Sequence, residues 1–450
     1  MLKKLHASLV LLLFGAIGFG QLKSGPMLGA IELRTAYIWC ELNAASQIKL
    51  EYWKLGDRRK VFHLIPSNFD RFNFKIREFF LTELEPGTSY EYQIVVDGKF
   101  RPNHAAGTFT TQKLWKWRED APDFSFLAGS CAYFNDSIFD RPGRAYGGDS
   151  SIFLSMAKEN AAMMLWLGDN WYYREVDFDS EWGLWYRASK DRSFPTLQPF
   201  LKAMSHYAIW DDHDYGPNNE GVAYIFKNEA KQIFTNYWSN PAKTQLQKGV
   251  YTKMSYSDVD FFMMDGRSFR SSDDMNDSLK ANPNPNKVMW GLEQMNWLKN
   301  QLLNSRATFK LIANGSPILN QYNKYDCMVH YINEFQELID FIIEEKISGV
   351  LFFTGDRHHS EITSRKLSDS YTTYDITSSS LTSGIYKLND YEKSNPDLLV
   401  DLLIDQNNYT KVSVHGKPKE RKLKVEFMDI KGMKLKEWEV HENQLKFLKY

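Results

Sequence analysis

Cysteine is scarce in this sequence. Only Cys40, Cys131 and Cys327 occur among 450 residues, so no network of disulfides can hold the fold together. The number is odd, which leaves at least one thiol without a disulfide partner. Each domain must therefore be stabilised by its own hydrophobic core, and the setting of each thiol decides its role.

An excess of charge of either sign is also missing. Lys and Arg together number 55 and Asp and Glu 56, which gives a net charge of -1. A protein that binds nucleic acid usually carries a basic excess, so we expect no nucleic-acid binding. The aromatic fraction is 15%. We expect most of these rings to fill the core and the loops, with sugar or lipid stacking as the alternative.

Long apolar runs are absent apart from one near the start. Lys3 and Lys4 precede an apolar stretch over residues 9–19, and small residues follow it before Gln21. This pattern is typical of a cleaved secretory signal, which we assign to residues 1–20. This apolar stretch is shorter than a membrane-spanning helix requires, and no second apolar stretch of this kind follows. We therefore expect an exported protein, periplasmic or extracellular, without an integral membrane segment. No feature of the sequence specifies an oligomeric state.

The first part of the chain has a β pattern. At 450 residues the chain is long enough for two domains. Short alternating runs predict strands over 35–41, 47–53, 77–81 and 88–97. A Pro-Gly turn before a strand that bears tyrosine resembles the corner of fibronectin-type sandwiches. We predict an all-β, fibronectin-like sandwich over residues 21–112 and a charged, Trp-rich linker over residues 113–122.

The pattern changes after residue 122. Apolar residues at helical spacing predict helices over 150–160, 226–239, 291–304 and 333–345, which fall between short apolar runs. Alternating strands and helices predict an α/β domain over residues 123–450. Two runs near its end, over 422–428 and 435–440, flank a turn and predict a hairpin.

Polar residues follow six of the apolar runs. They lie in the turns Gly129-Ser130-Cys131, Gly168-Asp169-Asn170-Trp171-Tyr172, Trp210-Asp211-Asp212-His213-Asp214, Asp265-Gly266-Arg267, Asn314-Gly315-Ser316 and Gly355-Asp356-Arg357-His358-His359. Polar groups gathered at one edge of a sheet are how α/β enzymes build their sites. A thiol, a phenol, carboxylates and an imidazole form a mixed set of soft and hard ligands, which suits two unlike metal ions. The sequence therefore indicates a binuclear metallohydrolase.

The first two turns supply the thiol and the phenol. Asp169 has two carboxylate oxygens, which allow it to bridge two cations, and Tyr172 can turn back towards the same point, where a phenolate would stabilise trivalent iron. Cys131 is either a small buried thiol or a metal ligand. We favour the ligand, because coordination would mask an unpaired thiol in an exported protein. Cys40 and Cys327 lack such a turn and are expected in the core.

The third turn, residues 210–214, is the densest cluster. Three carboxylates around one imidazole repel one another unless a cation or hydrogen bonds compensate, and a solvated loop is the alternative. We predict that Asp212 is a metal ligand. His213 would contact a substrate phosphate or protonate the leaving group, held in place by Asp214 or Asp211.

The last turn adds two more candidate ligands. Asp356 and His358 are two residues apart, which would place both on one side of an extended segment, so each could serve a different metal. His359 would then face away, and we expect it to have a supporting or structural role.

Two arginines and an asparagine complete the candidates. Arg267 and Arg270 follow a strand, where an arginine can bind a pair of phosphate oxygens, and an ion pair with Asp265 is the equal alternative for Arg267. Asn314 could offer a carbonyl oxygen to a metal or an amide to a phosphate, and turn formation is equally expected.

The sequence resembles the PhoD-type alkaline phosphatases in the order of five motifs. These are Gly129-Ser130-Cys131, Gly168-Asp169-x-x-Tyr172, Trp210-Asp211-Asp212-His213-Asp214, Asp265-x-Arg267-x-x-Arg270 and Gly355-Asp356-x-His358. The resemblance spans nearly the whole chain after the signal, and residues 24–29 look like the opening of that family.

The resemblance implies a metallophosphatase-like α/β fold, with two packed mixed sheets flanked by helices after the sandwich. It also implies a centre of Fe(III) and Ca²⁺, binuclear or larger. By the same resemblance, Fe(III) would be held by Cys131, Asp169, Tyr172 and His358. Asp169 would bridge to Ca²⁺ bound by Asp212 and Asp356.

The function expected from this resemblance is hydrolysis of phosphate monoesters or diesters, on small or polymeric substrates. Water activated by the metals would attack phosphorus, Arg267 would neutralise the growing charge and His213 would assist the leaving group. One alternative is a phosphodiesterase of phospholipase D or teichoic-acid type. A second is a non-catalytic cell-surface binding protein, which the intact set of clustered charges disfavours.

Overall fold

The computed structural model describes residues 22–100, 105–243 and 248–447. The predicted signal peptide, residues 1–20, lies outside the described residues. Within those ranges, no helix combines the length and the apolar character that a membrane span requires.

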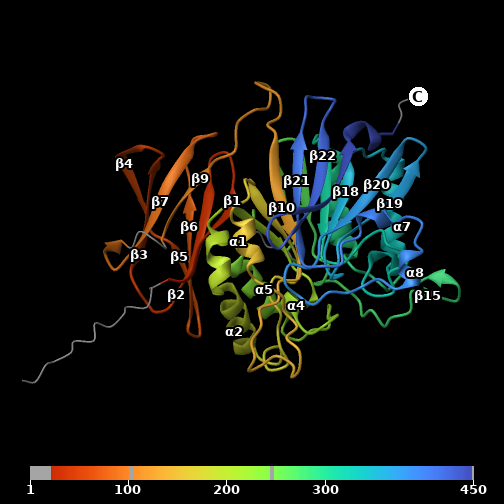
Figure 1. The fold of residues 1–450 in the computed structure, drawn as a ribbon, viewed down its shortest axis with the longest axis horizontal. Helices are drawn as coiled ribbons and strands as arrows, with labels where there is room; N and C mark the ends of the chain where they lie inside the picture. The colour runs from red at the N-terminus through yellow and green to blue at the C-terminus, as the bar shows by residue number, and fades with distance from the viewer. Residues whose placement is uncertain (1–21, 101–104, 244–247, 448–450) are drawn as a thin grey trace, which may run out of the picture.

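Two mixed β-sheets pack against each other at the centre of the molecule (Figure 1). The larger sheet has ten strands and the smaller has six. In spatial order the larger sheet consists of β23 (Lys434–His441), β22 (Lys422–Asp429), β21 (Asn408–His415), β10 (Phe124–Gly129), β11 (Met163–Leu167), β12 (Ser205–Ile209), β1 (Leu22–Ile31), β2 (Ala36–Leu42), β6 (Phe74–Leu81) and β5 (Ser67–Arg71). The smaller sheet consists of β13 (Thr252–Tyr256), β14 (Val259–Met263), β17 (Phe309–Asn314), β18 (Val350–Thr354), β20 (Tyr371–Thr377) and β19 (Glu361–Ser368).

The six apolar runs of the sequence become strands of these two sheets. β10, β11 and β12 are parallel neighbours in the larger sheet, and β14, β17 and β18 are parallel neighbours in the smaller one. Along β11, Met163 and Leu165 belong to the core between the sheets, whereas Met164 and Trp166 belong to a second core under the helices. Burial on both faces explains why these strands appear as continuous apolar runs in the sequence.

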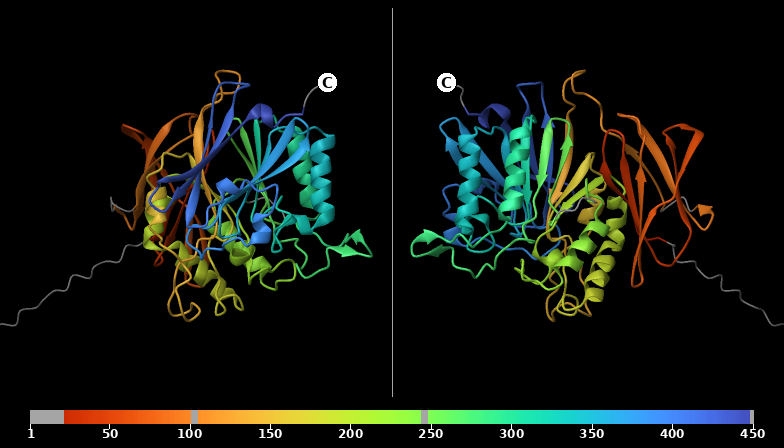
Figure 2. Two further views of the ribbon diagram at one scale, coloured as in Figure 1. Left: turned by 45° about the vertical axis from the view of Figure 1, so that its right-hand side comes forward. Right: turned by 180° about the vertical axis from the view of Figure 1, so that it is seen from behind.

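Helices cover the outer faces of the sheets (Figure 2). The larger sheet is covered by α1 (Ile152–Met156), α2 (Glu181–Arg192), α3 (Gln198–Leu201) and α5 (Lys227–Tyr237). The smaller sheet is covered by α6 (Gly291–Asn304) and α7 (Ile332–Glu344). The short elements are α4 (Asp212–Tyr215), α8 (Asp390–Lys393), the 3₁₀ helices η1 (Pro195–Leu197), η2 (Met328–His330), η3 (Val400–Leu402) and η4 (Glu442–Gln444), and the hairpin β15 (Ser278–Leu279) with β16 (Asn282–Pro283). The predicted pair of mixed sheets with flanking helices is confirmed.

The N-terminal region is all-β, as predicted. Its outer sheet consists of β4 (Asp57–Leu64), β3 (Ile48–Lys54), β7 (Ser89–Val96) and β8 (Lys99–Phe100), with β9 (Ala106–Thr110) paired to β7. Its inner sheet, β1-β2-β6-β5, continues the larger central sheet, because Leu28 of β1 pairs in parallel with Ser205 of β12. The backbone N–H of Glu85 donates to Tyr90 Oη at 2.9 Å, which is the predicted tyrosine corner. The boundaries at 112 and 122 stay a prediction.

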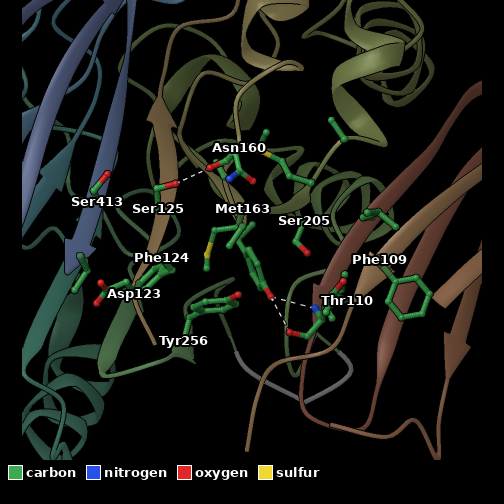
Figure 3. A pocket seen from close by; sticks show the side chains of 18 of the residues that line it. Phe109, Thr110, Asp123, Phe124, Ser125, Asn160, Met163, Ser205, Tyr256 and Ser413 are labelled. Carbon is green, nitrogen blue, oxygen red and sulfur yellow. Dashed lines mark hydrogen bonds between the residues drawn. The ribbon is translucent and has the colours of Figure 1, made fainter. Parts of the chain in front are cut away.

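A cleft of about 650 Å³ lies where the N-terminal region meets the amino ends of β10, β11 and β12 (Figure 3). Its lining includes Phe109, Phe124, Met163, Ser205 and Tyr256. The polar turns of the sequence follow the opposite, carboxyl ends of the same strands. This cleft is therefore separate from the candidate site described next.

Candidate metal centre

Four candidate ligands follow the carboxyl ends of parallel strands. Cys131 comes after β10, Asp169 after β11, Asp212 after β12 and Asp356 after β18. Because the two sheets pack against each other, these ends converge on one place. Donor atoms from these turns form three groups of residues, in each of which the atoms lie within 4.8 Å of one another.

Two glycines permit this convergence. Gly168 has a φ of +93°, and a Cβ added there would lie 2.7 Å from the Asp211 Cβ. A Cβ added at Gly355 would lie 2.6 Å from the carbonyl oxygen of Leu167. Both approaches are too close for a side chain, so glycine at 168 and 355 is required for the turns to meet.

Several candidate ligands have a left-handed backbone. The φ angles are 62° at Cys131, 54° at Asp169, 66° at Asp356 and 58° at His358. Residues other than glycine adopt this region at a cost of about 1–3 kcal/mol each, and such residues cluster at functional sites. Asp356 and His358 lie in different donor groups, as the sequence suggested. The predicted reason is wrong, because both residues have a left-handed backbone and do not form an extended segment.

The first donor group consists of Cys131, Asp169 and His358. The Cys131 thiol lies 3.5 Å from Asp169 Oδ2, to which Tyr172 Oη donates at 2.9 Å. Tyr172 Oη is also 3.3 Å from His358 Nε2. The structure therefore brings together one sulfur, one nitrogen, one carboxylate and one phenol, as the sequence predicts.

Two further groups overlap with the first. One consists of Asp169, Asp212 and His213, and the other of Asp211, Asp212 and Asp356. Asp169 is shared between the first and second groups and Asp212 between the second and third. Oδ1 of Asp212 is buried and has no hydrogen-bond partner among the described residues. This oxygen lies 3.8 Å from Arg267 Nη2. A buried carboxylate oxygen without a hydrogen bond, next to other carboxylates, fits a cation, and the third group, which offers only oxygen, fits a hard one.

Burial and crowding shift the acids of this centre in different directions. Burial and the neighbouring acids Asp212 and Asp211 raise the pKa of Asp169 well above its usual value. The pKa of Asp356 is raised by burial and by nearby acids in the same way. Burial also raises the pKa of Asp212, but His213 and Arg267 outweigh it and hold the pKa low. A cation would remove the repulsion and keep all three carboxylates ionised.

Arg267 and Arg270 lie beside this cluster, fully buried. Arg267 donates from Nε to Asp211 at 2.6 Å and from Nη2 to Asp326 at 2.8 Å, and Arg270 Nη2 lies 3.1 Å from Asp326. The structure favours ion pairing over direct phosphate contact for these arginines. The partners are Asp211 and Asp326, and not Asp265 as expected. Asp265 instead accepts the backbone N–H of Arg267 at 3.0 Å.

The structure corrects the role predicted for Asp214. Its carboxylate accepts the backbone N–H of Asp211 at 2.7 Å and the side-chain amide of Asn170 at 2.5 Å, so it holds the turn and not the imidazole. Asp211 is likewise occupied by Arg267. His213 is positioned differently: its ring stacks on Tyr172 with centroids 4.2 Å apart, and its side chain is 24% exposed.

Asn314 and His359 have structural partners. Asn314 Oδ1 accepts from Trp290 Nε1 at 2.9 Å and its amide donates to the carbonyl of Ser316 at 2.6 Å, which favours the turn-forming alternative. His359 Nε2 lies 3.2 Å from Glu361 and the ring is buried away from the donor groups. Cys40 and Cys327 are buried and unpaired, as predicted.

Three residues near the centre were not predicted from the sequence. Asp326 pairs with both arginines, Tyr146 Oη lies 3.1 Å from His358 Nδ1, and Ser379 Oγ donates to Cys131 Sγ at 3.2 Å. None of them follows an apolar run directly, so the strand-end signal that identified the other residues is missing for them.

Sulfur, nitrogen and oxygen donors that cluster at the strand ends of two packed sheets are typical of α/β proteins that bind metal ions. The chain belongs to the PhoD-like phosphatase family, whose family model matches residues 185–427. Alkaline phosphatase D of Bacillus subtilis (strain 168) is 23% identical over 325 residues, which cover 62% of this chain and 52% of that protein. The match thus spans about half the length of this curated relative. A solved structure of PhoD has a TM-score of 0.74 at 19% identity, with 93% of this chain and 90% of that one covered, which shows a shared fold.

Proposed function

We propose that this protein is a metal-dependent hydrolase of phosphoric esters with a metallophosphatase-like fold. The observation that carries the proposal is the overlap of three donor groups through Asp169 and Asp212, with the buried Asp212 Oδ1 left without a hydrogen-bond partner among the described residues. Membership of the PhoD-like phosphatase family and the activity named for its Bacillus subtilis relative support the same conclusion.

The donor chemistry divides the centre between two kinds of ion. We assign Cys131, Tyr172 and His358, with one oxygen of Asp169, to Fe(III), because thiolate and phenolate favour a trivalent iron. Asp212 and Asp356 offer only oxygen and, together with Asp169, would hold Ca²⁺. When bound, such ions would polarise the phosphoryl group and make water more acidic.

The chain's own residues then have distinct tasks. Tyr172 and Asp212 fix the imidazole of His213, through ring stacking at 4.2 Å and an Nε2 to Oδ2 distance of 4.0 Å. His213 is the partly exposed polar side chain that we assign to moving a proton to the leaving oxygen. Arg267 places positive charge next to Asp211 and Asp212 and favours their ionised forms, although burial still raises the pKa of Asp211 to about 6. Arg270 pairs with Asp326.

Metal removal and restoration tests the proposal. The purified protein should be coloured, because thiolate and phenolate ligands on Fe(III) absorb visible light. A calcium chelator should abolish hydrolysis while most of the colour stays, and calcium should restore the activity. A colourless, iron-free and fully active preparation would refute the assignment of iron.

Paired assays separate the proposed activity from its alternatives. p-Nitrophenyl phosphate reports monoester cleavage and bis(p-nitrophenyl) phosphate reports diester cleavage. Faster turnover of the diester would favour the phosphodiesterase alternative. If the metal-loaded protein cleaves neither compound, nor phospholipid or polymeric phosphodiesters, the chain is a binding protein and not a hydrolase. Export to the periplasm or the exterior is also part of our proposal, and fractionation of cells that express the full chain tests it.

A further inference from the structure

The loop between β9 and β10 exposes a tryptophan. Trp117 is 99% exposed, and Leu114 in the same loop is 44% exposed. Trp115, between them, is only partly buried. Single apolar side chains on a surface are ordinary, but three that share one turn form a patch that soluble proteins usually use for contact. We call residues 113–118 the tryptophan turn.

The tryptophan turn is held in one conformation. The carbonyl of Trp115 accepts the backbone N–H of Arg118 at 2.9 Å and that of Glu119 at 3.1 Å. Trp117 lies at the tip, with a left-handed φ of 67° that few residues other than glycine adopt. A mobile loop does not require a residue with a strained backbone. We infer that the backbone strain at Trp117 is the cost of holding its ring in an exposed position.

Both ends of the loop are tied to the body of the protein. Gln112 Nε2 donates to the carbonyl oxygens of Ile31 and Ser255, each at 3.1 Å. On the other side, the carbonyl of Pro122 accepts from Ser257 Oγ at 2.7 Å. The loop that carries Trp117 is therefore held at both of its ends.

Basic residues flank Trp117 in the sequence and in a neighbouring turn. Lys113, Lys116 and Arg118 are exposed in the turn itself, with no acid among residues 113–118. The turn between β21 and β22 adds exposed Lys417 and Lys419. It is joined to the loop, because the N–H of Gly416 donates to Asp123 Oδ1 at 3.2 Å, and both turns project from the same end of the molecule (Figure 1).

The acids of this end do not cancel its charge. Residues 113–123 and 416–421 contain four acids, Glu119, Asp120, Asp123 and Glu420. They contain six basic residues, which are Lys113, Lys116, Arg118, Lys417, Lys419 and Arg421, and Arg421 pairs with Asp123. The chain as a whole has a net charge of -1, so this end differs from the rest. An exposed tryptophan with flanking lysine and arginine is the composition that sits at the headgroup level of anionic bilayers.

We propose that the tryptophan turn and the β21–β22 turn dock this protein on an anionic lipid surface. β10 begins next to the tryptophan turn and ends next to Cys131, and a strand of this length spans roughly 20 Å. Docking therefore directs the metal centre away from the lipid. Given the hydrolase activity proposed above, on which this consequence rests, the substrate comes from the aqueous side and is not a headgroup of the same membrane.

Vesicle sedimentation of the full-length mature chain tests the docking directly. Vesicles of phosphatidylglycerol and phosphatidylcholine should bind the protein at low salt, whereas pure phosphatidylcholine vesicles should bind much less. Trp117→Ser and Lys116→Glu should each lower binding to the anionic vesicles on the order of tenfold. Leu292→Ser and Lys60→Glu, matched changes elsewhere on the surface, should leave it unchanged.

Quenching of fluorescence by brominated lipid adds a second readout. The wild type should lose tryptophan emission on brominated anionic vesicles, and Trp117→Ser should not. Lack of binding by the wild type, equal binding by Trp117→Ser, or binding to a soluble anionic polymer in place of the vesicles would each overturn the proposal. Hydrolysis of p-nitrophenyl phosphate, measured without lipid, should be the same in all variants, so failure of docking and failure of the proposed function are separate results.

Discussion

The candidate metal centre has two halves in which buried charge is compensated to different degrees. The arginine half consists of Asp211, Arg267, Arg270 and Asp326, and the donor half of Cys131, Asp169, Asp356 and His358. In the arginine half each buried acid has a guanidinium within 3.1 Å. In the donor half, burial and like charges raise the pKa values of both aspartates. Burial alone therefore does not mark a ligand site, whereas a buried charge without compensation does.

Backbone strain follows the same division. All four residues of the donor half have a left-handed φ, whereas no residue of the arginine half does in the described chain. Strain and uncompensated charge thus occur at the same residues. Both are costs that a bound cation would offset, since it binds only the folded arrangement of these ligands.

Removing Arg267 should destabilise the arginine half. Arg267→Ala leaves Asp211 and Asp326 buried with fewer partners, so we expect a loss of about 3–5 kcal/mol in the free energy of unfolding. Chemical denaturation measures it. The exposed Arg306→Ala should stay within about 0.5 kcal/mol of the wild type. A stability of Arg267→Ala equal to that of the wild type would show that the pairs contribute nothing.

His213 lies next to the donor half: its ring stacks on Tyr172, its side chain is partly exposed, and its Nε2 is 4.0 Å from Asp212 Oδ2. His213→Ala should lower kcat for p-nitrophenyl phosphate on the order of 10²–10³-fold, with the metal content and the melting temperature nearly unchanged. Steady-state kinetics with metal analysis of the same sample decides this. Wild-type kcat in the variant would remove His213 from the proposed chemistry.

The contribution of the arginine half to the free energy of unfolding should depend on pH. Burial raises the pKa of Asp326, but Arg270 and Arg267 outweigh it and hold the pKa below its usual value. The pKa is therefore lower in the folded state, and the stabilisation is present at neutral pH and is lost as the pH falls below about 4. Asp326→Asn should cost about 1–3 kcal/mol at pH 7, and the difference should shrink on acidification. A pH-independent difference in unfolding free energy would contradict this.

The smallest effect concerns a residue that supports the donor half. Tyr146 Oη lies 3.1 Å from His358 Nδ1, so the other ring nitrogen, Nε2, faces the donor group, where Tyr172 Oη is 3.3 Å away. Tyr146→Phe should weaken metal binding about tenfold, which competition with a chelator measures, and shift the visible absorption. Tyr391→Phe is the matched control on an exposed tyrosine. Unchanged affinity and spectrum in Tyr146→Phe would show that His358 does not need this contact.

Much of the fold could be predicted from the sequence. The strands that carry the turns are buried on both faces and so appear as apolar runs, and the helix over 291–304 was predicted with its observed ends. The C-terminal hairpin was predicted to within one residue at every strand end, and the start of β22 was predicted exactly. Helix α2 was missed, because its buried face carries Arg187 and Asp191, which hide the apolar pattern. Arg187 is stabilised there by a 2.7 Å ion pair with Asp177.

The candidate site was predictable where it depends on strand ends and not where it depends on tertiary contacts. Residues directly after a strand, such as Cys131 and Asp169, do converge. The partners of Arg267 and the placement of Asp214 depend on how separate turns pack, and a sequence does not show this. Asp326 lies in a long connection without an apolar run, so no local pattern identifies it.

Elemental analysis of Asp169→Asn decides whether this residue holds both proposed ions, because Asp169 belongs to two of the donor groups. The wild type, purified in parallel, serves as the reference, and circular dichroism establishes that the variant is folded. The account predicts that the folded variant loses both iron and calcium, together with its hydrolytic activity. Full occupancy of both metals in folded Asp169→Asn would contradict it.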